Sequence, residues 1–256
     1  MSNIFQGMKQ IVMDFANSSA TINYKKTESD VPTPWYAEWE SRNFASVLDN
    51  VFTKKCLSKI ADSYYGNQLD DILKDASEMT KEAYSDTYYI YKECCNSLRM
   101  QNSPKVYITR KIRGINALSV EIKGKKLILI SRQFIVRLTP KEQAFILGHE
   151  LGHHQQGNLV CHTINGLIKS AYDVSGILGT ILDDTLEIPL KHWHRDSEFN
   201  ADRAGYLCCK DWQTIETLFK NIGERKIHYS SIAELYAEHP FVRTRIEKLQ
   251  NYINSL

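Results

Sequence analysis

Three histidines and one glutamate fall within a single short segment, His149-Glu150-Leu151-Gly152-His153-His154. His149 and His153 are four residues apart, so a helix places both imidazoles on one face, as two ligands of a tetrahedral zinc ion require. Glu150 lies beside the first ligand without competing for the metal, and it can hold and deprotonate a water molecule that the metal activates. His154 lies about 100° further round the same helix and is expected to face elsewhere.

A catalytic zinc site needs a third protein ligand and one open coordination position. Glu198 and Asp202 are four residues apart in a segment with helical character, so one carboxylate can bind the metal while the other fixes a ligating imidazole through its distal N–H. The small and apolar residues that follow indicate burial, and a buried carboxylate needs a partner. We therefore favour one of these two carboxylates as the third ligand. The alternatives are His162, His192 and His194, of which the last two are the main rivals.

Composition and charge narrow the class of protein. The 256 residues are 43% hydrophobic, and 32 Lys and Arg nearly balance 30 Asp and Glu, with no concentrated basic segment. This balance argues against a nucleic-acid partner. No secretory signal is evident, and charges interrupt the most apolar stretch, Leu159–Leu190, before it is long enough to span a membrane. We expect a cytoplasmic protein with no transmembrane segment.

Cysteine occurs six times, and four of the six form two adjacent pairs, Cys94-Cys95 and Cys208-Cys209. Without an export signal, reduced thiols are the simplest interpretation, and free cysteine is among the most buried residue types. The alternative is that the two pairs bind a metal or act in redox chemistry.

The segments that must position the metal residues are a small sheet followed by helices. Strand patterns cover Val106–Thr109, Leu118–Ile122 and Lys126–Ser131, with a hairpin turn at Lys123-Gly124-Lys125. We expect a peptide substrate to add to an exposed strand at Leu127–Ser131.

Helix signals follow the strands. Thr139-Pro140-Lys141-Glu142 is a capping box that opens a helix through both motif histidines, ending near Gly157. Further helices are predicted at about 197–210 and 212–222, and Pro240 opens the last one. The apolar stripe of that helix is Val242, Ile246, Leu249, Ile253 and Leu256. The fold class is therefore α+β and mostly helical, with residues 1–100 forming a helical region packed on a catalytic domain at residues 101–256.

From about residue 105 to 250 the sequence resembles the HtpX-like and CAAX-prenyl-protease family of zinc metallopeptidases, in the gluzincin clan. Four segments in the same order carry the resemblance. They are Asn116-Ala117, Leu138–His153, Arg195–Asp202 and His239-Pro240 followed by Arg245-Ile246.

The resemblance implies roles for individual residues. His149, His153 and Glu198 would be ligands of one catalytic Zn²⁺, with Glu150 as the general base. Asp202 would orient a ligand histidine, which we expect to be His149. His239 and Arg245 would lie near the active site and assist the oxyanion or hold the site together, while Asn116 would lie at the substrate edge strand. Taken without the resemblance, His239 is a residue at a helix start and Arg245 a surface charge.

The predicted function is that of a zinc metalloendopeptidase acting on a peptide or protein substrate. Many members of the resembled family carry membrane helices, and the sequence shows none, so we expect a soluble member. The main alternative is a non-catalytic zinc protein that binds peptides or partners, and a thiol-based redox or metal-storage protein is a weaker one. The oligomeric state is not predicted.

Overall fold

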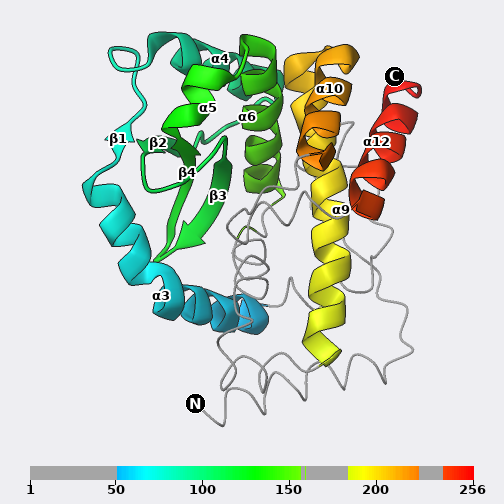
Figure 1. The fold of residues 1–256 in the computed structure, drawn as a ribbon. Coiled ribbons are helices and arrows are strands. Elements are labelled where there is room, and N and C mark those ends of the chain that lie inside the picture. The colour runs from blue at the N-terminus through cyan, green and yellow to red at the C-terminus, as the bar shows by residue number, and fades with distance from the viewer. Residues whose placement is uncertain (1–50, 157–158, 160–183, 225–238) are drawn as a thin grey trace.

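The structure, a computed structural model, describes residues 51–156, 159, 184–224 and 239–256 of the chain. Figure 1 shows a small sheet with helices packed around it. The elements in chain order are α3 (Val51–Lys74), β1 (Ser77–Glu78), α4 (Ser85–Ser97), β2 (Lys105–Thr109), β3 (Ala117–Ile122), β4 (Lys125–Ser131), α5 (Arg132–Arg137), α6 (Pro140–Gln155), α9 (Asp184–Cys209), α10 (Trp212–Glu224) and α12 (His239–Ile253).

The predicted α+β class is confirmed, with a four-stranded sheet of order β1-β2-β4-β3 and a majority of helix. All three predicted strands form. Ile122 pairs with Lys125, which leaves Lys123 and Gly124 as a two-residue hairpin turn. Both turn residues have positive φ, 51° and 69°, as a type I′ turn requires. The predicted hairpin is therefore confirmed in position and in turn chemistry.

The prediction of an exposed strand at Leu127–Ser131 is wrong. These residues form β4, which pairs in parallel with β2 on one side and antiparallel with β3 on the other. Leu127, Ile128, Leu129 and Ile130 are all buried, because both faces of the strand are covered by helices. Within the described residues, β3 pairs on one side only, so it forms the edge of the sheet that the substrate prediction requires.

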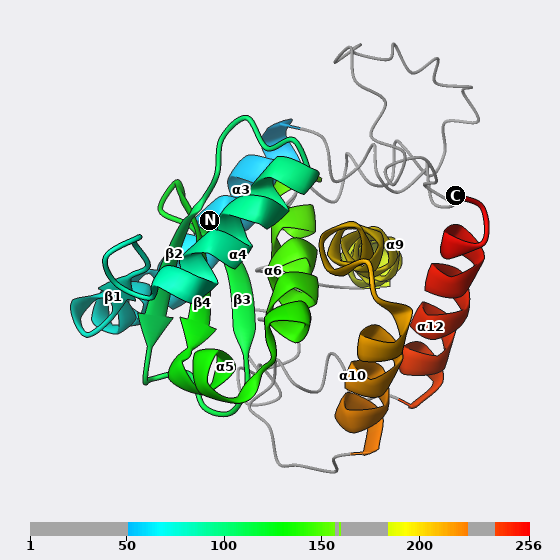
Figure 2. The same ribbon diagram turned by 90° about the horizontal axis from the view of Figure 1, so that it is seen from above.

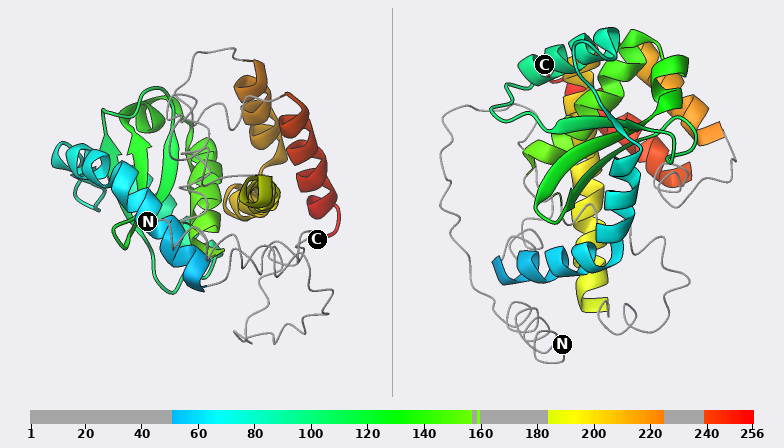
Figure 3. Two further views of the ribbon diagram at one scale, coloured as in Figure 1. Left: turned by 90° about the horizontal axis from the view of Figure 1, so that it is seen from below. Right: turned by 90° about the vertical axis from the view of Figure 1, so that its left-hand side faces the viewer.

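The sheet separates two layers of helices (Figure 3, left). On one face, Leu127 and Leu129 pack with Leu69 of α3 in one apolar cluster. On the other face, Ile128 and Ile130 join the larger core formed with α4, α6 and α9. The helices predicted within residues 1–100 are described from residue 51 onward, and α3 and α4 pack on opposite faces of the sheet. Each described helix is too short or too polar to cross a membrane.

Helix α6 carries the histidine motif and begins as predicted. The Thr139 side chain accepts a hydrogen bond from the Glu142 backbone N–H, while the Glu142 carboxylate accepts one from the Thr139 backbone N–H at 2.8 Å. Pro140 occupies the first turn, where its missing N–H has no intrahelical partner to lose. The cap fixes where the helix starts, and thereby which residues face α9.

Helices α6 and α9 run side by side, with α9 seen almost end-on between α6 and the pair α10–α12 (Figure 2). Small residues bring the two backbones close. A Cβ on Gly152 would lie 2.9 Å from the Ala204 Cβ and 3.0 Å from the Ala201 Cα. A Cβ on Gly205 would lie 2.7 Å from the Phe145 carbonyl oxygen. This close contact carries the residues of α9 to within reach of the histidines on α6.

We expect Gly205→Ala to lower the free energy of unfolding by about 1–3 kcal/mol, because the new methyl group meets backbone that cannot rotate away. Gly66→Ala in α3 is the matched control, since the atom nearest its Cβ is Cε of the flexible Lys123 side chain. The control should be neutral or stabilising, because alanine favours helix over glycine. Urea denaturation measures both. Equal stability of the two variants would contradict the close packing of α6 and α9.

The last helix begins at His239, next to the predicted Pro240, but its predicted apolar stripe is only partly correct. The buried residues are Val242, Arg245, Leu249 and Tyr252, whereas Leu256 is 68% exposed. The difference arises because Arg245 lies on the buried face of this helix. A pattern of apolar residues cannot include an arginine, so its burial was not predicted.

Candidate metal centre

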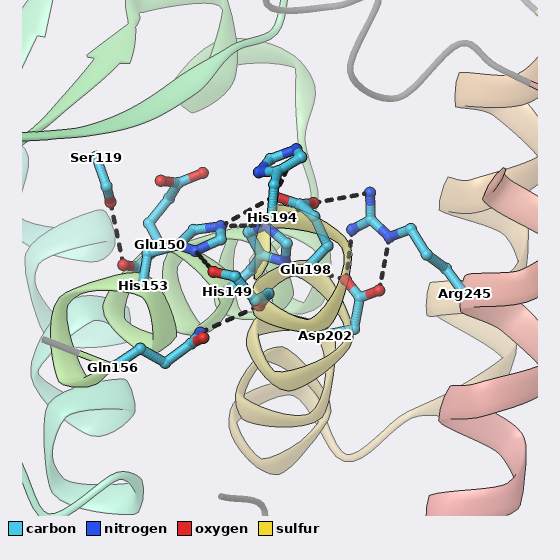
Figure 4. Close-up of polar contacts among 10 residues, drawn as sticks. Ser119, His149, Glu150, His153, Gln156, His194, Glu198, Asp202 and Arg245 are labelled. Atoms are coloured by element: carbon cyan, nitrogen blue, oxygen red, sulfur yellow. Dashed lines mark hydrogen bonds and ion pairs between the residues drawn. The ribbon is translucent and has the colours of Figure 1, made fainter. Parts of the chain in front are cut away.

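His149, His153 and Glu198 form a compact and fully buried donor group (Figure 4). The two Nε2 atoms are 3.0 Å apart. Oε2 of Glu198 lies 3.6 Å from Nε2 of His149, and Oε1 lies 3.3 Å from Nε2 of His153. Among the described residues this is the group of histidine, cysteine and carboxylate side chains arranged to hold a metal ion. The structure thus brings Glu198 of α9 to the two histidines of α6.

Hydrogen bonds on the far side of each imidazole show that the group fits a metal. Nδ1 of His149 lies 3.0 Å from Oδ1 of Asp202, and an ionised carboxylate only accepts, so His149 carries its proton on Nδ1. Nδ1 of His153 lies 3.1 Å from the Ser197 hydroxyl, which can accept a hydrogen bond from it. With the proton of each neutral imidazole on Nδ1, the lone pairs of the two Nε2 atoms face the same point. A zinc ion at about 2.0–2.1 Å from each nitrogen suits this arrangement.

The charges in the site also favour a cation. Burial alone would raise the pKa of Glu198, but the Arg245 guanidinium and the histidines outweigh it and hold the pKa well below its usual value, so the carboxylate stays ionised. Burial lowers the pKa of His153, which keeps that imidazole neutral. Burial also opposes charge on His149, yet Asp202 and Glu198 raise its pKa. The donor group thus attracts positive charge in the form of a proton or a metal.

Asp202 and Arg245 close the site behind the donor group. Asp202 contacts His149, as predicted, and Nε of Arg245 donates to Oδ2 of Asp202 at 2.6 Å. Nη1 of Arg245 lies 3.2 Å from Oε2 of Glu198. The Arg245 side chain is 1% exposed, so its interpretation as a surface charge is wrong. Of the two roles implied for Arg245, holding the site together is the one that these contacts favour.

Glu150 is buried beside the donor group. Its Oε2 atom has no hydrogen-bond partner among the described residues. Its backbone carbonyl accepts a hydrogen bond from the Ser119 hydroxyl at 3.0 Å, which ties α6 to the edge strand β3. In Figure 4 the Glu150 carboxylate points away from Asp202. An unpaired buried carboxylate is unfavourable for stability, and such groups concentrate where a protein performs chemistry.

The other predicted residues lie at the margin of the site or beyond it. His194 is buried, with Nε2 3.8 Å from Oε1 of Glu198, beside the donor group but outside it. Asn116 directly precedes β3, and its backbone N–H donates to the Ser131 hydroxyl at 3.1 Å. The side chains of His162, His192 and His239 lie outside the described residues.

The two vicinal cysteine pairs are free thiols in the structure. Cys94, Cys95 and Cys209 are buried in the core shared by α4, α6 and α9. Burial raises the pKa of Cys95, and it raises the pKa of Cys209 to about 11. Thiols with a raised pKa are poor nucleophiles and poor metal ligands at neutral pH, so Cys95 and Cys209 serve packing.

Ser197 and Gln156 contribute to the site but were not predicted. The Ser197 hydroxyl holds His153, and Nε2 of Gln156 donates to the Ser197 backbone carbonyl at 3.1 Å. A histidine that binds a metal almost always forms a hydrogen bond through its other ring nitrogen. The sequence therefore indicates that His153 has such a partner, but it does not identify Ser197 as that partner.

We expect Ser197→Ala to weaken zinc binding about 10- to 100-fold, because His153 loses the group that fixes its ring. Competition with a chromogenic chelator measures the affinity. Thr217→Ala in α10 is the control, since the exposed Thr217 hydroxyl donates to the Gln213 carbonyl within its own helix. Unchanged affinity in Ser197→Ala would show that the Ser197 contact does not support the ligand.

Comparisons with known proteins agree with this site. A model of peptidase family M48 matches residues 86–253, which is more than half of the chain. The plastoglobule-localized metallopeptidase 48 of Arabidopsis thaliana, named as chloroplastic, is 31% identical over 146 residues. That alignment covers 56% of this chain and 42% of the relative, so the chain spans less than half of the relative's length. No solved structure matched the chain. The extent of the family match, together with the buried histidine and glutamate donors, shows that the chain belongs to peptidase family M48.

Proposed function

We propose that this protein is a zinc-dependent metalloendopeptidase with one catalytic zinc ion. The observation that carries the proposal is the buried donor group of His149, His153 and Glu198, with the carboxylate of Glu150 next to it. Membership of a peptidase family and the likeness to a named metallopeptidase support the same reaction.

The residues divide the work of peptide hydrolysis among them. His149, His153 and Glu198 would hold the zinc ion, which when bound polarises the scissile carbonyl and makes a water molecule more acidic. Glu150 accepts a proton from the attacking water on its carboxylate as the new C–O bond forms. It then passes this proton to the amide nitrogen as the C–N bond breaks, so the carboxylate is regenerated.

The substrate is proposed to bind as an extended peptide along the edge of β3 that pairs with no other described strand. Main-chain hydrogen bonds to an edge strand bind peptides of many sequences in one register. The hydrogen bond from Ser119 to the Glu150 carbonyl fixes the distance between this edge and the base. Asn116, directly before β3, is proposed to contact the same substrate.

We further propose that the chain belongs to the HtpX-like and CAAX-prenyl-protease branch and that His239 acts near the oxyanion. A helical region at residues 1–100 is proposed to pack on a catalytic domain at residues 101–256. A cytoplasmic location also stays a prediction, and the name of the Arabidopsis relative places that protein in the chloroplast.

Metal analysis combined with cleavage of a mixed peptide library tests the proposal. We expect one zinc ion per chain, internal cleavage of library peptides, loss of cleavage with 1,10-phenanthroline, and recovery when zinc is restored. Zinc binding without any cleavage would favour a non-catalytic zinc protein that binds peptides or partners. Cleavage that persists after the metal is removed would refute the zinc mechanism.

A further inference from the structure

His194 is a buried histidine next to the metal donors that the proposed mechanism does not yet use. It lies one helical turn before Glu198 on α9 and is 5% exposed. Its Nε2 atom is 3.8 Å from Oε1 of Glu198, too far for a hydrogen bond and near enough to share the site.

Helix α9 presents three polar side chains to the site at a spacing of four residues, His194, Glu198 and Asp202. At the Asp202 end of this row, the carboxylate already forms hydrogen bonds with His149 and Arg245. His194 lies at the opposite end, beyond Glu198. In Figure 4 its imidazole and the Glu150 carboxylate project on the same side of the donor group, away from Asp202 and Gln156. These two side chains therefore flank the side where the proposed reaction takes place.

We propose that His194 is a further catalytic residue, which donates an N–H hydrogen bond to the scissile carbonyl oxygen. In this arrangement the scissile carbonyl lies between His194 and Glu150. This inference rests on the proposed peptidase function. The carbonyl oxygen gains negative charge as water attacks, and a fixed donor in a buried site stabilises that charge more than the ground state. No covalent bond to His194 forms or breaks.

The geometry distinguishes this role from that of a fourth metal ligand. The ligand atoms of His149, His153 and Glu198 lie within 4.8 Å of one another, and His194 falls outside this group. Zinc affinity should therefore be almost independent of His194, whereas stabilisation of the oxyanion should depend on it.

The test compares wild type, His194→Ala and His194→Gln, each loaded with zinc. Two inhibitors are used, phosphoryl-Leu-Phe, which carries a tetrahedral oxyanion, and mercaptoacetyl-Leu-Phe, which binds through sulfur. We expect His194→Ala to lose about 10²-fold or more in kcat/KM and in affinity for the phosphoryl dipeptide. Affinities for zinc and for the mercapto dipeptide should stay within about threefold. His194→Gln keeps an N–H donor and should recover part of the loss.

His154→Gln is the matched control, because His154 is another largely buried imidazole, directly beside His153 but outside the donor group. It should keep the wild-type affinity for both inhibitors. A parallel fall of zinc affinity and activity in both His194 variants would overturn the proposal, as would unchanged affinity for the phosphoryl dipeptide in His194→Ala. A wild-type protein that binds zinc but cleaves nothing would instead refute the proposed function, and the role of His194 with it.

Discussion

We expect Glu150→Gln to lower kcat/KM for peptide cleavage by about 10²- to 10⁴-fold, the usual contribution of a general base, and to keep one zinc ion per chain. The amide has nearly the same shape as the carboxylate but cannot accept and pass on a proton. Because Glu150 is not part of the donor group, its replacement leaves His149, His153 and Glu198 in place. Discontinuous cleavage assays and metal analysis on the same preparation measure both quantities.

The same variant should be at least as stable as the wild type. Glu150 is 2% exposed, and its Oε2 atom has no hydrogen-bond partner among the described residues. Burying a neutral amide is less unfavourable in free energy than burying an unpaired carboxylate, so the melting temperature should stay equal or rise. A gain in stability with a loss of activity is the pattern expected of a functional residue, since active sites retain unfavourable groups for their chemistry.

Glu216→Gln in α10 is the control for removing a carboxylate, because Glu216 is only partly buried and, among the described residues, pairs with Lys220 of the same helix. It should change neither activity nor zinc content. If Glu150→Gln keeps its zinc and cleaves peptides at the wild-type rate, Glu150 is not the general base.

Local rules explain why helix α6 could be predicted from the sequence. A capping box at Thr139 and Glu142 fixes the start of the helix, and a spacing of four residues then places His149 and His153 on one face. The same spacing relates Glu198 to Asp202. Spacings within two helical turns could therefore be predicted, whereas the start of α9 could not, since it begins at Asp184, 13 residues before the predicted start at 197.

The pairing of strands depends on contacts between residues that are far apart in the sequence, which short sequence patterns do not reveal. Strand β4 is central because it pairs with β2, which lies before β3 in the chain, as well as with β3. A signal was present, since Leu127–Ile130 is an uninterrupted apolar run, which is typical of a strand buried on both faces. For this reason β3, and not β4, lies at an edge of the described sheet.

The burial of Arg245 and the contact of Ser197 with His153 also depend on distant partners. Arg245 meets Asp202, 43 residues earlier in the chain, and Ser197 meets His153, 44 residues away. Arginine is seldom fully buried unless it is paired, so the sequence alone favours an exposed position. Only the packing of α12 against α9 reveals that the guanidinium has two carboxylates to bond.

Arg245→Met should have the largest effect on stability, lowering the free energy of unfolding by about 3–5 kcal/mol, as expected when one partner of a buried ion pair is removed. Methionine can still pack on the Phe219 ring, which the guanidinium covers at 5.1 Å from the ring centroid. It cannot neutralise Glu198 and Asp202, so two carboxylates stay buried with reduced compensation. Because whole proteins are stable by only about 5–15 kcal/mol, this loss removes a large part of the stability of the metal-free protein.

The pH dependence of this loss follows from the lowered pKa of Glu198. A carboxylate whose pKa is depressed on folding stabilises the wild type above its ordinary pKa, and this contribution fades as the pH falls. The stability difference between metal-free wild type and Arg245→Met should therefore be large at neutral pH and shrink in acid. Urea denaturation across pH measures it, and a constant difference would mean that the charge of Glu198 is not involved.

Arg243→Met separates the role of this site from a general effect of removing arginine from α12. The Arg243 side chain is exposed and pairs with Glu247 one turn away on the same helix, so its loss should change stability by less than about 0.5 kcal/mol. Adding Asp202→Asn to Arg245→Met should cost less than the sum of the two single changes, because the second substitution removes one of the carboxylates that the first left unpaired. Additive effects would instead show that Arg245 stabilises α12 through packing alone, and that the charges of α9 need no partner from it.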